Sequence, residues 1–96
     1  MKKDEILEVL EEVKEEVKHK YKAEIKGIFG SYARGDERED SDIDVLVDFR
    51  EGAGLFDLVG LGLFLEEKLQ CKVDIVPQSA LREEIKPYVL KEIVYL

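Results

Sequence analysis

The chain has 96 residues and a formal net charge of −8, and charged side chains make up 40% of it. A chain of this length is expected to form a single domain over residues 1–96, without separate template-binding and acceptor-binding domains. The acidic balance argues against a nucleic-acid partner, which needs clustered Lys and Arg to neutralise its phosphates, and favours a protein partner.

Cysteine usage and hydropathy predict a cytoplasmic protein. Cys71 is the only cysteine, so no intramolecular disulfide can form and a secreted disulfide scaffold is excluded. The N-terminus lacks the apolar core of a signal peptide, and the weakly charged stretch 52–65 is too short to span a membrane. The chain also lacks Asn and Thr and is rich in Glu and Lys, a composition that resembles that of hyperthermophile proteins.

Hydrophobic periodicity predicts the elements of the first half. Apolar residues at helical spacing predict an amphipathic helix over Lys3–Lys20. Ala23–Phe29 is predicted as a strand that ends at Gly30. Residues 32–39 are polar and are predicted as one or two helical turns and a loop.

The second half is predicted to contain two further strands. Ile43–Phe49 is a strongly β-prone run and is predicted as the central strand. Leu55–Gln70 is predicted as a helix, and Lys72–Val76 as a third strand. The remainder, Ser79–Leu96, is predicted as a turn of helix followed by a second helix that begins near Pro87.

This order predicts an α/β domain of the α+β kind, with a small mixed sheet of three or four strands. The loop 31–41 can return the chain for an antiparallel pair, and the helix 55–70 can act as a right-handed crossover between parallel strands. The end of the first strand and the beginnings of the other two then meet at one edge. The helix 55–70 is more apolar than one core-facing stripe requires, so either two-sided burial or an interface with a partner explains it.

Three aspartates are predicted to meet at that edge. Asp42 and Asp44 are two residues apart on a strand and so share a face, and Asp74 interrupts the apolar third strand. Carboxylates that converge without a cation repel one another, and their oxygens are ligands that Mg²⁺ prefers. We therefore expect two Mg²⁺ ions here, which can clamp both ends of an in-line displacement. Asp48 lies at the far end of its strand and is left out.

Gly30 and Ser31 are candidate phosphate-binding residues. A glycine lets the backbone approach a phosphate closely, and Ser31 can open a helix whose first N–H groups and hydroxyl donate to phosphate oxygens. Arg34 lies one turn further on, where it can neutralise a triphosphate or pair with neighbouring acidic residues. Arg38 is expected to form such pairs, and Cys71 to be a small buried residue.

A family resemblance rests on two motifs at a set spacing, Gly30-Ser31-Tyr32-Ala33-Arg34-Gly35 and Ser41-Asp42-Ile43-Asp44. Together they resemble the signature of minimal nucleotidyltransferases, small members of the DNA polymerase β superfamily. Val73-Asp74-Ile75-Val76 is similar to the third-carboxylate strand of that family, and segment 81–96 to its C-terminal helix. The resemblance covers nearly the whole chain and implies the polymerase β-like nucleotidyltransferase fold.

The resemblance also implies a role for each site residue. The three aspartates would hold the Mg²⁺ ions, and Asp74 would help to deprotonate the attacking hydroxyl. Gly30 and Ser31 would hold the β- and γ-phosphates of a nucleoside triphosphate, with Arg34 assisting. The implied reaction moves a nucleoside monophosphate, AMP when the substrate is ATP, onto an acceptor hydroxyl with release of pyrophosphate.

The expected acceptor is a protein. Small proteins of this family pair with helical HEPN-domain partners as antitoxin and toxin, and some transfer AMP to a tyrosine of that partner. Two alternatives stay open: a non-catalytic binding module that neutralises its partner by complex formation, and a small-molecule nucleotidyltransferase subunit. A homo-oligomer or hetero-oligomer is compatible with each.

Overall fold

The computed structural model covers residues 1–96 and contains helices and strands in mixed order. The predicted elements form with small shifts at their ends, except in the C-terminal segment. Their bounds are α1 Lys3–Tyr21, β1 Ala23–Phe29, α2 Ser31–Arg34, β2 Ile43–Phe49, α3 Leu55–Leu69, β3 Val73–Pro77, the 3₁₀ turn η1 Gln78–Ala80, α4 Lys86–Glu92 and β4 Val94–Tyr95.

The strands form one mixed sheet in the order β3-β2-β1-β4. β1 pairs with β2 in antiparallel fashion, whereas β2 and β3 are parallel. β4 adds a second antiparallel neighbour to β1. These pairings confirm the predicted mixed sheet, and β2 lies inside it as expected.

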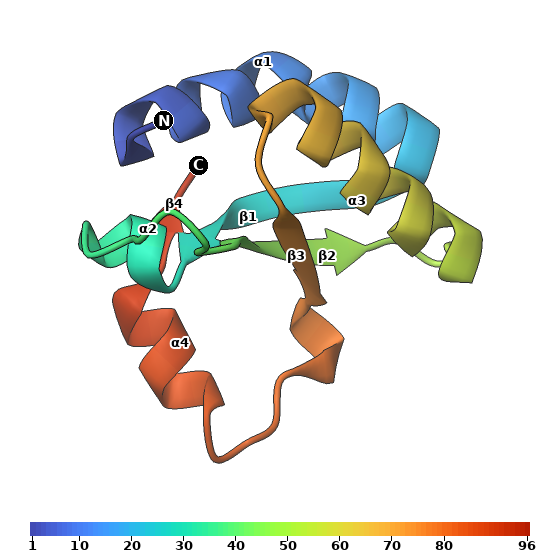
Figure 1. The fold of residues 1–96 in the computed structure, drawn as a ribbon. Coiled ribbons are helices and arrows are strands. Elements are labelled where there is room, and N and C mark those ends of the chain that lie inside the picture. The colour runs from blue at the N-terminus through green and yellow to red at the C-terminus, as the bar shows by residue number, and fades with distance from the viewer.

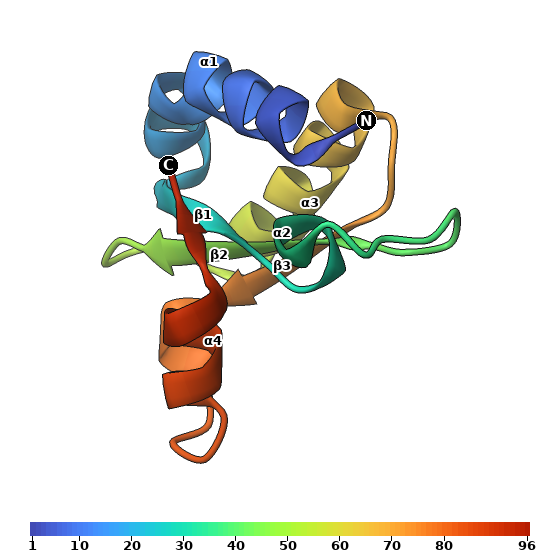
Figure 2. The ribbon, with the colours of Figure 1, turned by 90° about the vertical axis from the view of Figure 1, so that its left-hand side faces the viewer.

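Helices α1 and α3 lie together over one face of the sheet, and α4 lies on the opposite side (Figure 1 and Figure 2). The core fills the space between the sheet and the two longer helices, and burial of its apolar side chains is the main stabilising contribution. Its buried members are Ile6, Leu10, Val13, Val17, Ala23, Ile25, Ile28, Tyr32, Ile43, Val45, Val47, Leu61, Leu65 and Leu69.

Strand β2 has two chemically different faces. Ile43, Val45 and Val47 are fully buried in the core beneath the helices. Side chains alternate along a strand, so Asp44 points to the other face, where it is half-buried. The apolar residues that fix β2 in the core therefore also fix the direction of the Asp44 side chain.

The C-terminal segment differs from the prediction. The helix expected over 81–96 is confined to α4, and the chain then forms β4. The β-branched and aromatic residues of Ile93–Tyr95 favour a strand, and the free edge of β1 supplies the pairing partner. Helical propensity in this short segment is overridden by a tertiary partner that the local pattern does not reveal.

Helix α3 buries one side and exposes the other. Leu61, Leu65 and Leu69 are buried in the core. Large apolar side chains are exposed on the rest of the helix: Leu55 is 72% exposed, Phe56 92%, Val59 52% and Leu63 64%. The sheet and α1 therefore cover only part of the apolar surface of α3, which supports the interface alternative over two-sided burial. None of the helices is both long and apolar enough to cross a membrane.

Gly27 is the position at which β4 can approach β1. A Cβ placed on Gly27 would lie 2.2 Å from the Val94 carbonyl oxygen and 2.9 Å from the Tyr95 Cα. Both atoms belong to the backbone and cannot rotate away. The pairing of the C-terminal strand therefore requires glycine at this position.

The substitution Gly27→Ala is expected to lower the free energy of unfolding by about 1–3 kcal/mol, because the new methyl group overlaps the β4 backbone. Urea denaturation measures the loss. Gly62→Ala is the matched control: its Cβ would meet only the Ile75 side chain, at 3.7 Å. In a helix that change is neutral or stabilising by up to about 1 kcal/mol. Equal effects of the two substitutions would contradict the close-approach argument.

Candidate functional site

The register of the sheet brings two of the three predicted aspartates together. Asp44 is the cross-strand partner of Phe29 on one side and of Asp74 on the other. The end of β1 and the beginnings of β2 and β3 therefore meet in one row, as predicted. Two carboxylates from neighbouring strands lie side by side on the face opposite α1 and α3.

Asp42 lies just before β2 begins and is exposed, as is Asp74, whereas Asp44 is half-buried. In this structure no group of three His, Cys, Asp or Glu side chains is placed to hold one metal ion, and the convergence of Asp42, Asp44 and Asp74 on a pair of Mg²⁺ ions stays a prediction. Like charges repel, so the three carboxylates are expected to come together only around a cation.

The electrostatics of the site centre on Asp44. Burial, and then the negative charges of Asp74 and Asp42, raise the pKa of the Asp44 carboxyl to about 6. The guanidinium of Arg34 opposes this shift, and Glu92 adds to it. Negative charge thus exceeds positive charge at this edge of the sheet.

The donor set fits a hard divalent cation. Asp42, Asp44 and Asp74 offer carboxylate oxygens, and at Asp44 burial and then repulsion by the other two raise the pKa of the carboxyl. A bound cation would remove that repulsion. The residues therefore suit Mg²⁺ in chemistry and in charge.

Gly30 lies directly against Asp44. Its φ is +78°, in the region that favours glycine, and a Cβ there would lie 2.1 Å from the Asp44 Oδ2 atom. Gly30 caps α2, and Ser31 is the first residue of that helix, as predicted. The glycine thus turns the chain out of β1 while leaving space for the carboxylate beside it.

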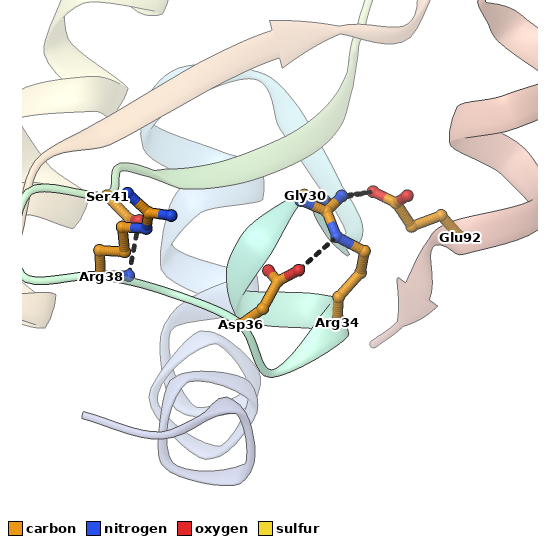
Figure 3. A network of polar contacts seen from close by, with 6 residues as sticks. All are labelled: Gly30, Arg34, Asp36, Arg38, Ser41 and Glu92. Atoms are coloured by element: carbon orange, nitrogen blue, oxygen red, sulfur yellow. Dashed lines mark hydrogen bonds and ion pairs between the residues drawn. The ribbon is translucent and has the colours of Figure 1, made fainter.

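Arg34 forms two ion pairs (Figure 3). Its Nε lies 3.2 Å from the Asp36 Oδ2 atom, and its Nη1 lies 3.0 Å from the Glu92 Oε1 atom. The side chain is about half exposed, at 48%, so a ligand can reach it. The alternative that Arg34 pairs with a neighbouring acidic residue is confirmed, and the second pair is one that the sequence did not indicate.

The expected ion pairs of Arg38 are absent. Its backbone N–H instead donates to the Ser41 Oγ atom at 2.8 Å, which closes the turn before β2 (Figure 3). A turn in which the serine hydroxyl accepts this bond orders the loop without the arginine side chain. Arg38 therefore has no assigned part in the site.

Glu92 is the residue that sequence reasoning missed. Its Oε1 atom accepts hydrogen bonds from the Gly30 backbone N–H at 2.7 Å and from Arg34 Nη1 at 3.0 Å. No local signal marks this residue, because it stands in a charged C-terminal helix 62 positions after Gly30. The contact depends on β4, which was also missed.

Tyr32 and Cys71 fix the loop that carries Gly30 and Ser31. The Tyr32 hydroxyl lies 3.6 Å from the Cys71 Sγ atom, and the thiol also donates to the Ser41 carbonyl at 3.7 Å. The hydrogen bond with Cys71 and then burial raise the pKa of Tyr32 to about 12. Cys71, half-buried, has a structural contact here, in agreement with the non-nucleophilic role expected for it.

The raised pKa of Asp44 predicts how stability depends on pH. Because this pKa lies at about 6 in the folded chain and at 3.8 ordinarily, the folded protein binds more protons than the unfolded chain between these values. In metal-free buffer the free energy of unfolding should therefore fall as the pH rises through this window. Asp44→Asn should remove this fall in the free energy of unfolding. At pH 7 the variant should be more stable than wild type by about 1 kcal/mol, a small value because water screens a half-buried carboxyl.

Urea unfolding with a chelator, at pH values inside and above the window, measures this difference. Asp48→Asn is the control, since Asp48 lies on the same strand and is exposed. An Asp44→Asn variant that keeps the wild-type loss of stability between the two pH values would rule out Asp44 as its source.

Comparison with known proteins identifies the family. Residues 8–96 match the family model described as the nucleotidyltransferase domain. Protein adenylyltransferase MntA of Thermococcus cleftensis is 47% identical over 70 residues, which cover 73% of this chain and 71% of the relative. A protein of Methanocaldococcus jannaschii, provisionally named protein adenylyltransferase MJ0126, is 43% identical over 89 residues. These residues cover 93% of this chain and 88% of the relative.

Solved structures agree with the sequence relatives. One, provisionally described as a minimal nucleotidyltransferase, superposes with a TM-score of 0.76 at 42% identity and covers 94% of this chain and 95% of its own. A toxin–antitoxin structure with AMP-PNP shares the fold, with a TM-score of 0.70 at 21% identity, and covers 99% of this chain and 72% of its own. The chain therefore belongs to the nucleotidyltransferase domain family and is an enzyme of the minimal nucleotidyltransferase type.

Proposed function

We propose that this chain transfers AMP from ATP to a hydroxyl group of a protein partner and releases pyrophosphate. The observation that supports it most is the row formed by Asp44 and Asp74 on neighbouring strands, with the Gly30 backbone directly beside it. Carboxylates next to a backbone that leaves room for phosphate suit a reaction at a phosphorus atom, where positioning and charge supply most of the catalysis.

In the proposed reaction the acceptor oxygen attacks the α-phosphorus of ATP. A new P–O bond forms, the bond between the α-phosphorus and the bridging oxygen breaks, and pyrophosphate leaves. The proton of the attacking hydroxyl passes toward the Asp74 carboxylate. Asp42, Asp44 and Asp74 would hold Mg²⁺, which supplies charge neutralisation for the phosphates when bound. Gly30, Ser31 and Arg34 would hold the β- and γ-phosphates.

ATP as the substrate is supported by the relatives. Two proteins above 40% identity carry the name protein adenylyltransferase, and a structure of the same fold was solved with AMP-PNP, an analogue of ATP. ATP is also abundant in the cytoplasm, the location we propose. The chain is proposed to act as one minimal domain over residues 1–96, with the acceptor hydroxyl on a protein partner.

The partner is proposed to be a HEPN-type toxin for which this chain is the antitoxin. Structures that share its fold are toxin–antitoxin complexes. The exposed apolar side chains of α3, among them Phe56 at 92% and Leu55 at 72%, offer a surface that a protein partner would cover. The net charge of −8 favours a partner that is basic where the two meet.

Label transfer from α-³²P-ATP in the presence of Mg²⁺ tests the proposal. The protein would be incubated with its co-purifying partner, and label should appear on the partner. Asp44→Ala and Asp74→Ala should each reduce transfer roughly 100-fold or more, because each removes a proposed metal ligand. Asp48→Ala, on the same strand but at its far end, is the matched control and should retain activity.

Each other result has a defined meaning. Label transfer that persists in Asp44→Ala contradicts the proposed metal site. A stable complex that transfers no label from any nucleoside triphosphate supports the non-catalytic binding module instead. Label that appears on a small hydroxyl compound rather than on the protein supports a small-molecule nucleotidyltransferase.

A further inference from the structure

Glu92 occupies the two donors that the proposed function assigns to phosphate. The Gly30 N–H and the Arg34 guanidinium both point at one oxygen, Oε1 of Glu92, at 2.7 and 3.0 Å (Figure 3). A carboxylate oxygen and a phosphate oxygen accept hydrogen bonds from the same donors, and bonds to ionised acceptors are the strong ones. Glu92 must leave before a phosphate oxygen can accept from the single Gly30 N–H and from the same Arg34 N–H.

The contact does more than orient an arginine. Arg34 is already held by Asp36 at 3.2 Å, so a second carboxylate is not needed to order its side chain. Glu92 also accepts a hydrogen bond from the Gly30 backbone N–H. This bond has no part in orienting Arg34. The carboxylate therefore fills the position at which backbone and guanidinium donors converge, as a bound oxyanion would.

Glu92 also adds negative charge at the place where a triphosphate would bring more. Gly30, which donates to Glu92, lies so close to Asp44 that a Cβ on it would be 2.1 Å from the Asp44 Oδ2 atom. In the proposed function Asp44 would be compensated by Mg²⁺, and Glu92 would remain a carboxylate without a metal beside the phosphate. Repulsion between like charges in a half-buried site then weakens binding as long as Glu92 stays in place.

The segment that carries Glu92 can release it without unfolding the core. None of the residues of α4 is buried. The neighbouring residue Ile93 is only 8% exposed, and β4 pairs with β1 through Gly27 and Ile28. The backbone after Glu92 is thus anchored, while its long side chain, on an open helix, can swing away by rotation about its own bonds.

We propose that Glu92 is an internal competitor for phosphate that sets the affinity of the site for nucleotide. The inference rests on the proposed function, since it takes Gly30 and Arg34 as the phosphate donors. In the free protein Glu92 accepts from the single Gly30 N–H and from one N–H of the Arg34 guanidinium. Triphosphate binding displaces the carboxylate, so part of the binding free energy is spent on breaking its two hydrogen bonds.

The test compares Glu92→Gln with wild type. The amide keeps the size of the side chain and an acceptor oxygen but removes the charge. Glu84→Gln is the matched control, because Glu84 is exposed in the same C-terminal segment and changes the net charge equally. Dissociation constants would be measured by calorimetry at fixed pH and ionic strength for two probes: α,β-methylene-ATP with Mg²⁺, and inorganic pyrophosphate.

Glu92→Gln is expected to tighten binding of both probes by on the order of tenfold, since a charge-assisted bond is about twice as strong as a neutral one. Glu84→Gln should change either constant less than about twofold, because an exposed charge is screened. Glu92→Asp, which keeps the charge but cannot reach both donors, should also tighten binding. Thermal unfolding of each variant verifies that the fold is retained.

The outcomes separate this inference from the proposed function. Weaker binding in Glu92→Gln would overturn the inference and make Glu92 a positioning residue for Gly30 and Arg34, with nucleotide binding intact. Equal binding in Glu92→Gln and Glu84→Gln would also overturn it. Tighter binding of pyrophosphate with no binding of the ATP analogue by any variant would support the competitor and contradict the nucleotide substrate. If no variant bound either probe, both the inference about Glu92 and the proposed function would be overturned.

Discussion

The alignment of Phe29, Asp44 and Asp74 across three adjacent strands is the constraint on which the rest of the site depends. It exists because β1 returns in antiparallel fashion while the α3 crossover makes β3 parallel to β2. Only a mixed sheet brings the end of one strand to the beginnings of the two others. The apolar residues between the aspartates fix this register, since a slip by one position would expose Val45 and bury Asp44.

The repulsion between the carboxylates of the site is confined to the face of the sheet opposite α1 and α3. The core beneath α1 and α3 contains no charged side chain, so the carboxylates of β2 and β3 stand on the side that water can reach. Even there, burial and the neighbouring aspartates raise the pKa of Asp44 to about 6. Such a perturbed carboxyl is typical of functional sites, where affinity for a cation is gained at the expense of stability in its absence.

The sequence predicted those parts of the fold and site that depend on local pattern. The alternation in Ile43–Phe49 identified the central strand and the face on which Asp44 lies, and the helix 55–70 indicated the parallel crossover. Contacts between distant residues were not predictable in the same way. The pairing of β4 depends on the free edge of β1, and the bond from Gly30 to Glu92 spans 62 positions with no motif at either end. The raised pKa of Asp44 depends first on burial and then on the charges of Asp74 and Asp42, and residue spacing does not report burial.

The two ends of the domain therefore contribute different properties to one site. Residues 30–44 supply the glycine, the first helix turn and the aspartates, all fixed by the core through β1 and β2. The C-terminal segment supplies Glu92 from a helix without buried residues, anchored only by Ile93 and a two-residue strand. The fixed part has an excess of negative charge, and the Gly30 N–H and the Arg34 guanidinium are the groups in it that can donate to an oxyanion. In this structure the oxyanion that they bind is the Glu92 carboxylate, which β4 helps to hold nearby. If Gly30 and Arg34 bind phosphate as proposed, Glu92 is a competitor within reach of both groups, and the strength of its contact with them sets how tightly nucleotide binds.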